Sequence, residues 1–310
     1  MSIDSFPQSF SLYTNIFSYM GLPLSRNPDD ADVFVIGLPY DLATSGRAGT
    51  RSGPPAIRQI SANLRWEEKR WPWDFCAFDR LRIADYGDLE FPVGNHEGFI
   101  EQVDLHYGKL LAAGKTMLSF GGDHYVTLPV MRAHSRQHGK LAMIHFDAHT
   151  DTYEEEGSAY SHGSMFYHAP REGIIDADKS IQIGIRTEYT ESKHDFEVIS
   201  AAVTNDLSVE QIISRVKKRV ADTPCYITFD IDCLDPAYAP GTGTPVIGGL
   251  TTDRALKIIR GLPGLNIIGM DIVEVAPSYD HADITSLAAA TLGLEMLYVL
   301  AANKGEVITG

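Results

Sequence analysis

The chain has 310 residues, of which 44% are hydrophobic, so it is long enough to bury a full core. Its 41 acidic and 26 basic residues give a formal net charge of −15, which disfavours nucleic acid and anionic membranes as partners and favours cations or cationic substrates. The three cysteines are few, odd in number and lack metal-type spacing. They argue against a disulfide framework and predict a cytoplasmic protein.

Short apolar segments alternate along the chain with segments of helical periodicity. The predicted strands cover residues 33–37, 82–84, 117–120, 141–146, 181–185, 225–229 and 266–272. The predicted helices between them cover residues 56–63, 98–113, 128–138, 208–220 and 252–260, and Ser208 and Thr252 are the predicted N-caps of the last two. Such alternation predicts an α/β fold of three α/β/α layers with a mostly parallel central sheet.

No internal repeat or low-complexity linker divides the chain. We therefore expect an N-terminal extension at residues 1–30, packed on the body or on a neighbouring subunit, and a single domain at residues 31–310. The start of the chain lacks a basic segment followed by an apolar one, so we expect no secretory signal. The apolar stretch 284–302 contains polar residues and Glu295, which favours a helix packed in the core over a membrane span.

Two aspartate-rich segments follow predicted strands: HFDAHTD at residues 145–151 and FDIDCLDP at residues 229–236. If each segment continues as extended strand, Asp147, His149 and Asp151 share one face, as do Asp230 and Asp232 on theirs. Four carboxylates brought together without a cation would repel one another, and some would have to take up protons. A bound divalent metal removes that repulsion.

A third segment, SFGGDHYVTLP, supplies a histidine shortly after another predicted strand. The candidate ligands are then His124, Asp147, His149, Asp151, Asp230 and Asp232. This oxygen-rich set without thiolates suits manganese better than a structural zinc site, although zinc, iron or cobalt remain open. Each segment alone could be an ordinary turn, strand end or loop, but three of them after three predicted strands favour a binuclear metal site.

With these segments in place, the chain resembles the ureohydrolases, the binuclear manganese enzymes that include agmatinase and arginase and that share their fold with related deacetylases. The resemblance runs from about residue 30 to the C-terminus, and over the whole chain it is strongest to bacterial agmatinases. The motifs that carry it are GLPYDLATSGRAGTRSGPPAIR, SFGGDH, HFDAHTDTY, SHGSMF, TFDIDCLDPAYAPGTGTPVIGGL and GMDIVEVAPSYD.

The resemblance implies two Mn²⁺ ions per chain and a role for each matching residue. One ion is expected on His124, Asp147, Asp151 and Asp230, and the other on Asp147, His149, Asp230 and Asp232, so that Asp147 and Asp230 bridge. The implied activity is that of a manganese-dependent amidinohydrolase, in which metal-bound hydroxide attacks the guanidinium carbon of agmatine and yields putrescine and urea. That reaction would belong to putrescine, polyamine and spermidine biosynthesis.

Three residues are the expected catalytic groups. His162 matches the family's proton-shuttle histidine, and an unperturbed imidazole titrates near pH 6.5, which suits proton transfer. Glu274 follows an apolar segment and is expected to anchor the cationic guanidinium, while Asp151 also orients the attacking hydroxide. His145 and Asp271 are expected to have structural roles.

Substrate choice among guanidino compounds is open at this level. The acidic segment 154–156 would repel a carboxylate and attract an amine, which favours agmatine over arginine, but it could equally be a solvated acidic loop. The alternatives are a guanidinobutyrase, an arginase, or a metal-binding scaffold without turnover. By resemblance we expect a homo-oligomer of three or six chains, and the roles of Arg47 and Arg51 stay open.

Overall fold

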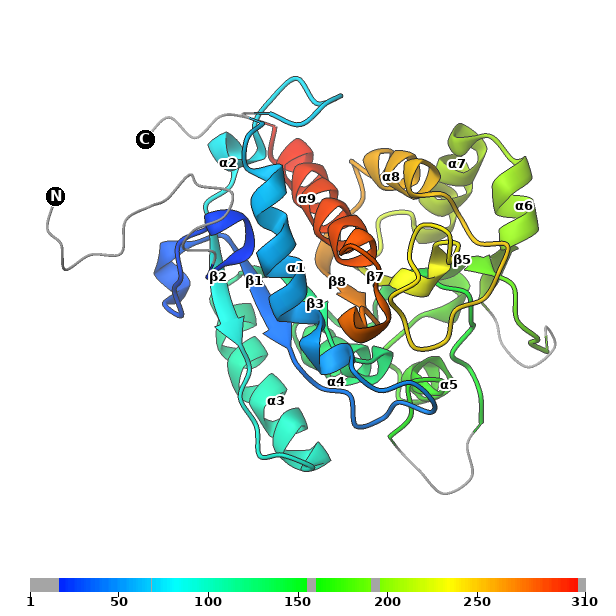
Figure 1. Cartoon of the computed structure of the whole chain (residues 1–310), viewed down its shortest axis with the longest axis horizontal. Helices are drawn as coiled ribbons and strands as arrows, with labels where there is room; N and C mark the ends of the chain where they lie inside the picture. The colour runs from blue at the N-terminus through cyan, green and yellow to red at the C-terminus, as the bar shows by residue number, and fades with distance from the viewer. Residues whose placement is uncertain (1–16, 68, 155–159, 191–195, 306–310) are drawn as a thin grey trace, which may run out of the picture.

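The computed structural model describes residues 17–67, 69–154, 160–190 and 196–305, and in them one eight-stranded sheet forms the centre of the molecule (Figure 1). Its order is β2-β1-β3-β8-β7-β4-β5-β6, and every pairing is parallel. The strands are β1 (Val33–Leu38), β2 (Ile83–Asp88), β3 (Thr116–Gly121), β4 (Ala142–Phe146), β5 (Ile181–Ile185), β6 (Glu197–Ser200), β7 (Cys225–Asp230) and β8 (Ile267–Val273). The mostly parallel sheet that we predicted is therefore wholly parallel.

Helices cover both faces of the sheet, which confirms the three-layer prediction (Figure 1). They are α1 (Gly53–Ser61), α2 (Ala77–Arg80), α3 (His96–Ala112), α4 (Thr127–His138), α5 (Met165–Arg171), α6 (Ala201–Asp206), α7 (Val209–Val220), α8 (Thr252–Arg260) and α9 (Ile284–Lys304). Short 3-10 helices lie at Tyr19–Gly21, Pro28–Asp30, Thr50–Ser52, Ala62–Leu64, His124–Val126, Ala177–Lys179, Ile231–Cys233 and Pro277–Tyr279.

Alternate residues of each strand enter different cores. On β1, Val33 and Val35 pack into the apolar cluster beneath α1, α7, α8 and α9, whereas Phe34 and Ile36 pack into the cluster beneath α3, α4 and α5. Every residue of β1, β4, β5, β7 and β8 is buried, so both faces of these strands are covered, as is usual for a parallel sheet. This is why the strands could be recognised as nearly continuous apolar segments.

The predicted elements differ from the observed ones mainly where an element is short. Strand β6 and helices α2, α5 and α6 have between four and seven residues, too few to show a clear period. Strand β2 runs past the predicted residue 84, because Asp85 is stabilised inside the sheet by Arg58, whose Nε and Nη2 donate to its carboxylate over 2.8 and 3.0 Å.

Helix caps decide where two predicted helices begin. Ser208 caps α7 as predicted, in a capping box. Its hydroxyl accepts from the backbone N–H of Gln211, and the side chain of Gln211 accepts from the backbone N–H of Ser208. The predicted cap of α8 is wrong by one residue, because the Oγ1 of Thr251, not Thr252, accepts from the backbone N–H of Arg254 over 3.1 Å.

The described part of the N-terminal segment lies on the body. Tyr19 is buried; its backbone N–H donates to Asp85 Oδ2 over 2.7 Å and its hydroxyl donates to the Ala290 carbonyl over 2.6 Å. Residues 1–16 of the expected extension lie outside the described residues. The division into an extension at residues 1–30 and one domain at residues 31–310 therefore stays a prediction.

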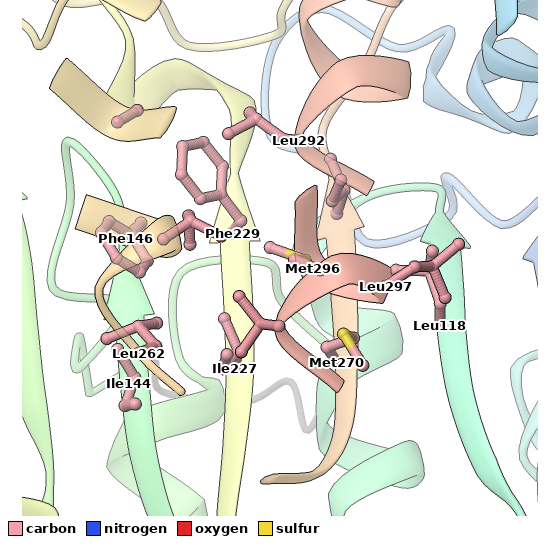
Figure 2. Packing of buried hydrophobic residues seen from close by; sticks show 14 of the residues in the cluster. Leu118, Ile144, Phe146, Ile227, Phe229, Leu262, Met270, Leu292, Met296 and Leu297 are labelled. Carbon is pink, nitrogen blue, oxygen red and sulfur yellow. The ribbon is translucent and has the colours of Figure 1, made fainter. Parts of the chain in front are cut away.

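Helix α9 forms the centre of the larger core. By length and composition it could cross a membrane, with a mean hydropathy of 1.6 in its most apolar window, but 72% of that window is buried inside the protein. Leu292, Met296 and Leu297 of this helix pack on Phe229 and Met270 of the central strands (Figure 2). The prediction of a core-packed helix is confirmed.

A buried carboxylate on α9 anchors the loop that precedes α2. Glu295 Oε1 accepts from Arg70 Nε over 2.8 Å and from Arg260 Nη2 over 2.5 Å, and Oε2 accepts from Trp73 Nε1 over 2.7 Å. The side chain of Glu295 has no exposed surface, so its charge depends on these partners. An acidic residue within an apolar helix is thus explained by two arginines that meet it inside the fold.

Replacing Glu295 with alanine should lower the free energy of unfolding by about 3–5 kcal/mol, because two half-buried guanidinium groups lose their counter-charge. Denaturant titration followed by circular dichroism measures the change. As a control, Asp104→Ala removes an exposed ion pair with Arg136 and should leave stability nearly unchanged. Equal losses in the two variants would contradict the buried role of Glu295.

Candidate metal centre and its surroundings

Four neighbouring strands in the middle of the sheet deliver the polar residues that the sequence singled out. The strands β3, β8, β7 and β4 are adjacent and parallel, so their carboxyl ends meet at one edge, where ligands bind in open α/β sheets. His124 lies just after β3, Glu274 directly after β8, Asp147 directly after β4, and Asp230 is the last residue of β7.

The extended geometry that we expected for the ligand segments is wrong, although the residues do converge. Strand β4 ends at Phe146, so Asp147, His149 and Asp151 lie in the following loop, and Asp151 has a positive φ of 51°. The loop turns because the backbone N–H of His149 donates to Asp147 Oδ1 over 2.6 Å. Local side-chain to backbone hydrogen bonds, rather than strand alternation, therefore aim these groups.

The second aspartate segment turns in the same way. Asp232 lies in the short helix Ile231–Cys233, and its backbone N–H donates to Asp230 Oδ1 over 2.8 Å. Its own carboxylate reaches back across the edge of the sheet, where Oδ1 accepts from the backbone N–H of Ala148 over 3.0 Å. The two aspartate segments are thus bonded to each other as well as to themselves.

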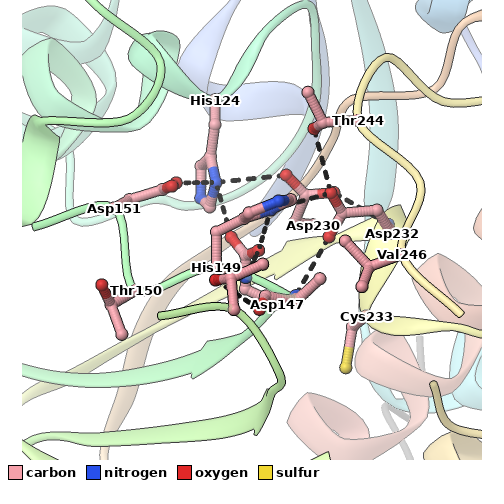
Figure 3. Close-up of polar contacts among 12 residues, drawn as sticks. His124, Asp147, His149, Thr150, Asp151, Asp230, Asp232, Cys233, Thr244 and Val246 are labelled. Atoms are coloured by element: carbon pink, nitrogen blue, oxygen red, sulfur yellow. Dashed lines mark hydrogen bonds and ion pairs between the residues drawn. The ribbon is translucent and has the colours of Figure 1, made fainter. Parts of the chain in front are cut away.

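All six candidate ligands meet in two groups that share Asp147 (Figure 3). In the first group, His124 Nδ1 lies 2.9 Å from Asp151 Oδ2, 3.1 Å from Asp147 Oδ2 and 3.4 Å from Asp230 Oδ2. In the second, His149 Nδ1 lies 3.1 Å from Asp232 Oδ2 and 3.3 Å from Asp147 Oδ1. The predicted set is brought together without exception.

The donor atoms fit a pair of divalent cations. His124 Nδ1 is buried and makes no hydrogen bond, while Nε2 lies 2.9 Å from Thr228 Oγ1. In the tautomer that donates Nε2–H to Thr228, Nδ1 turns a lone pair toward three carboxylates. Such an arrangement is unfavourable by itself, but it is the geometry of an imidazole and carboxylates that share a metal ion.

The electrostatics of the carboxylates agree with this fit. Burial, together with the charges of Asp232 and Asp147, raises the pKa of Asp230 well above its usual range. Burial and the charge of Asp147 likewise raise the pKa of Asp151 and of Asp232. Burial would also raise the pKa of Asp147, but the neighbouring histidines, His145 above all, outweigh it and hold that pKa well below its usual range. Without a cation Asp151, Asp230 and Asp232 can stay ionised only at an energetic cost, so a bound cation would stabilise the folded site.

Two buried polar side chains outside the six candidate ligands, His145 and Gln182, support Asp147. His145 Nε2 lies 2.7 Å from Asp147 Oδ2, and His145 Nδ1 lies 3.0 Å from Gln182 Nε2 in the middle of β5. These contacts orient Asp147. A ring nitrogen of His145 also lies within 4.8 Å of ligand atoms of His124, Asp147 and Asp151, so the structural role expected for His145 stays a prediction. Only the unusual polarity of Gln182 within a buried strand could have pointed to it from the sequence.

Arg186 fixes the loops that carry the second group, and no sequence motif indicated it. Its guanidinium donates to the carbonyl oxygens of Asp232 over 2.6 Å and of Val246 over 2.7 Å. It also donates to the carbonyls of Gly184, Cys233 and Leu234. One side chain thus joins the end of β5 to the segment after β7 and to the loop that contains Thr244, whose hydroxyl donates to Asp232 Oδ2 over 3.2 Å.

Glu274 presents an unpaired oxygen beside the metal ligands. The residue is buried, and its Oε1 accepts from the backbone N–H of His124 over 2.8 Å, whereas Oε2 has no partner. A buried carboxylate oxygen without a partner is costly and is best satisfied by a cation. Gly243 keeps the adjoining space open, since a Cβ at this position would lie 3.5 Å from Oε2 and 3.2 Å from the Arg47 carbonyl oxygen.

His162 contacts the same carboxylate from the other side. Its Nδ1 lies 2.9 Å from Glu274 Oε1, and its Nε2 lies 2.7 Å from Ser45 Oγ. Burial lowers the pKa of His162, but the hydrogen bond to Glu274 and its charge outweigh burial and raise that pKa to about 9. A raised pKa suits an imidazole that acts as an acid near neutral pH.

The remaining predicted residues lie outside this cluster. Glu154 is exposed and accepts from the Tyr167 hydroxyl over 2.5 Å, while Glu155 and Glu156 lie outside the described residues. The guanidinium of Arg47 lies 5.2 Å from the centre of the Tyr279 ring, and that of Arg51 pairs with the buried Asp41.

Asp271 has the structural role that we expected. Its Oδ2 accepts from Thr127 Oγ1 over 2.8 Å and from the Tyr226 hydroxyl over 2.9 Å. Both bonds are buried beneath the sheet edge, and they connect β8 to the start of α4 and to β7.

Comparison with known proteins gives one consistent result. Residues 31–298 match the model of the arginase family. An agmatinase from Escherichia coli O1:K1 is 59% identical over 298 residues, which cover 96% of this chain and 97% of the relative. An agmatinase from Serratia proteamaculans (strain 568) is 58% identical over 95% of this chain and 96% of its own length.

Solved structures agree with the sequence matches. A crystal structure of a hypothetical agmatinase from Burkholderia thailandensis has a TM-score of 0.92 and 43% identity, covering 96% of this chain and 94% of that one. The proclavaminate amidino hydrolase from Streptomyces clavuligerus has a TM-score of 0.90 and 38% identity, covering 94% and 99%. The resemblance to ureohydrolases that the motifs indicated is confirmed.

Substitution of Arg186 should weaken metal binding, because the carbonyl groups that it holds belong to the segment that positions Asp232. We expect Arg186→Lys to lower the affinity for Mn²⁺ by about 10–100-fold, the usual cost of losing a residue that supports metal ligands. Calorimetric titration of metal-free protein measures this directly.

The matched control is Arg215→Lys, which alters an ion pair with Glu197 away from the site. Affinities that fall equally in both variants, or in neither, would show that Arg186 does not support the metal ligands.

Proposed function

The chain belongs to the arginase family, and from that premise we propose that it is an agmatinase, which hydrolyses agmatine to putrescine and urea. The observation that carries the proposal is the identity of 58–59% to agmatinases over nearly the full length of both chains. The site adds chemical support, because an unpaired buried carboxylate oxygen, suited to a guanidinium, lies beside a metal-capable cluster.

We propose that the cluster holds two Mn²⁺ ions per chain. His124, Asp147, Asp151 and Asp230 would hold one, and Asp147, His149, Asp230 and Asp232 the other. The oxygen-rich donor set without thiolates supports manganese over a structural zinc site. When bound, such ions supply Lewis acidity and lower the pKa of a coordinated water toward neutrality.

The protein groups around the cluster bind and orient the substrate. Glu274 Oε2 would pair with the guanidinium, an interaction strengthened by burial, and it would hold the guanidinium carbon beside Asp151. Asp151 would orient the attacking water by accepting its hydrogen bond. His162, which shares Glu274 Oε1 through Nδ1, would give a proton to the departing amine nitrogen.

Beyond the guanidinium, the substrate carries an amine in agmatine, a carboxylate in 4-guanidinobutanoate and both groups in arginine. The net charge of −15 favours a doubly cationic substrate through the general field of the protein. The Streptomyces relative is an amidino hydrolase of a different compound at 38% identity, so the fold accommodates more than one such substrate. A guanidinobutyrase or an arginase is therefore the second candidate, and a scaffold without turnover the third.

The biological setting follows from the same proposal. Putrescine is a polyamine, so the enzyme would serve polyamine and spermidine biosynthesis. We place it in the cytoplasm as a homo-oligomer of three or six chains, acting on a small guanidino molecule rather than on nucleic acid or a membrane. The small, odd number of cysteines and the acidic composition support this setting.

Urea release from agmatine, arginine and 4-guanidinobutanoate, each with enzyme preloaded with manganese, tests the substrate. We expect agmatine to give the highest kcat/KM, because only its tail is cationic without a carboxylate. Higher values for arginine or for the acid would refute the agmatinase assignment. Two bound metals per chain without urea from any of the three would favour the scaffold.

Replacing Glu274 with glutamine tests the guanidinium anchor. The amide keeps the size of the side chain but loses the charge, so we expect kcat/KM for agmatine to fall by about 10²–10³-fold, as when one preorganised electrostatic contact is removed. The control is Glu172→Gln on the exposed Arg132 pair, which should keep full activity. Nearly unchanged kcat/KM in the Glu274 variant would exclude it as the anchor.

A further inference from the structure

Two threonine hydroxyl groups connect the ring of His124 to the carboxylate of Asp271. His124 Nε2 lies 2.9 Å from Thr228 Oγ1, and Thr228 Oγ1 lies 3.5 Å from Thr127 Oγ1. Thr127 Oγ1 donates to Asp271 Oδ2 over 2.8 Å. The hydrogen-bonded chain thus crosses three elements, because Thr228 belongs to β7, Asp271 to β8, and Thr127 begins α4.

The chain lies inside the protein along its whole length. All four of its residues have no exposed surface. Thr228 and Asp271 are direct partners in the register of β7 and β8, so the sheet itself holds two members of the chain together. Bulk water therefore does not compete for these groups, and each must find its partner within the chain.

The group at the end of the chain decides its direction, because each hydroxyl has a single proton to donate. Asp271 Oδ2 accepts from Thr127 and also from the Tyr226 hydroxyl, the latter over 2.9 Å. Thr127 has then used its proton, so its oxygen accepts from Thr228. The oxygen of Thr228 in turn accepts from the ring. The chain therefore places the ring proton of His124 on Nε2.

The surroundings of the other ring nitrogen favour the opposite arrangement. His124 Nδ1 lies between 2.9 and 3.4 Å from oxygens of Asp151, Asp147 and Asp230 (Figure 3). Three carboxylates would hold an Nδ1–H well, but an Nδ1 that carries a proton has no lone pair for a metal ion. A preference for the proton at Nε2 opposes this effect and leaves Nδ1 free.

We propose that Asp271 is a positioning residue that, through Thr127 and Thr228, keeps the ring proton of His124 on Nε2 and so keeps Nδ1 available to the first metal ion. The inference rests on the proposed function, in which His124 is a ligand of that ion. Asp271 acts only through the two threonines. Its hydrogen bonds join β8 to α4 and β7, and they also set the direction of the chain that ends at the ligand.

Calorimetric titration of metal-free protein with Mn²⁺ tests both ends of the chain. Thr228→Ser keeps the hydroxyl and should bind like the wild-type protein, whereas Thr228→Val should lower the affinity for the first ion by about 10–100-fold. Asp271→Leu removes the final acceptor and should cause a loss in the same range. Asp271→Asn can still accept through its amide oxygen and should bind nearly as well as the wild-type protein.

Tyr226→Phe is the control for a merely structural role. It removes a buried hydrogen bond to the same oxygen of Asp271 but leaves the chain to His124 uninterrupted. It should lower the free energy of unfolding and leave the Mn²⁺ affinity unchanged. If Asp271→Leu does not fold, Thr127→Val interrupts the chain beside the carboxylate and should show the same loss of affinity.

Electron paramagnetic resonance of the same samples shows whether the bound ions are paired. At a Mn²⁺ concentration that fills the wild-type protein, Asp271→Leu and Thr228→Val should give the signal of isolated ions instead of a coupled pair. Wild-type affinity in Asp271→Leu, or equal losses in Asp271→Leu and Tyr226→Phe, would overturn the inference. The expected losses in a protein whose wild-type form binds both ions but releases no urea from agmatine would support the inference and refute the proposed function.

Discussion

The molecule is organised around the convergence of buried carboxylates at one edge of a parallel sheet. Asp147, Asp151, Asp230 and Asp232 are all nearly inaccessible to solvent, and oxygens of the first three lie within 3.4 Å of a single histidine nitrogen. Such a group of like charges is tolerable only with a cation among them. The parallel order β3-β8-β7-β4 brings these residues together, because it places four strand ends side by side.

Residues outside the candidate ligand set hold the ligand side chains in place through hydrogen bonds. Gln182 and His145 orient Asp147, Thr228 fixes the ring of His124, and Arg186 joins the loops beside Asp232. Each contact limits the movement of a ligand, and accurate ligand placement is what metal affinity and reactivity require. The ring of His162 is also held on two sides, by Glu274 at Nδ1 and by Ser45 at Nε2.

Some of this arrangement could be predicted from the sequence, and the rest could not. Strands such as β7 were recognisable because both their faces are buried, and the six candidate ligands because carboxylates and histidines closely followed such strands. The loop geometry of Asp147 to Asp151 was missed, because hydrogen bonds within the loop override strand alternation. Arg186 and Ser45 contact partners 46 and 117 residues away along the chain, and no local pattern encodes such contacts.

The central claim is that six side chains hold two divalent ions with Asp147 and Asp230 between them. Anomalous diffraction from a crystal of the manganese-loaded protein tests it most directly, because the metal signal locates each ion independently of the protein model. The account predicts two peaks per chain, both in contact with Asp147 and Asp230, one also with His124 and the other with His149. A single peak, or two peaks of which neither contacts both aspartates, would contradict it.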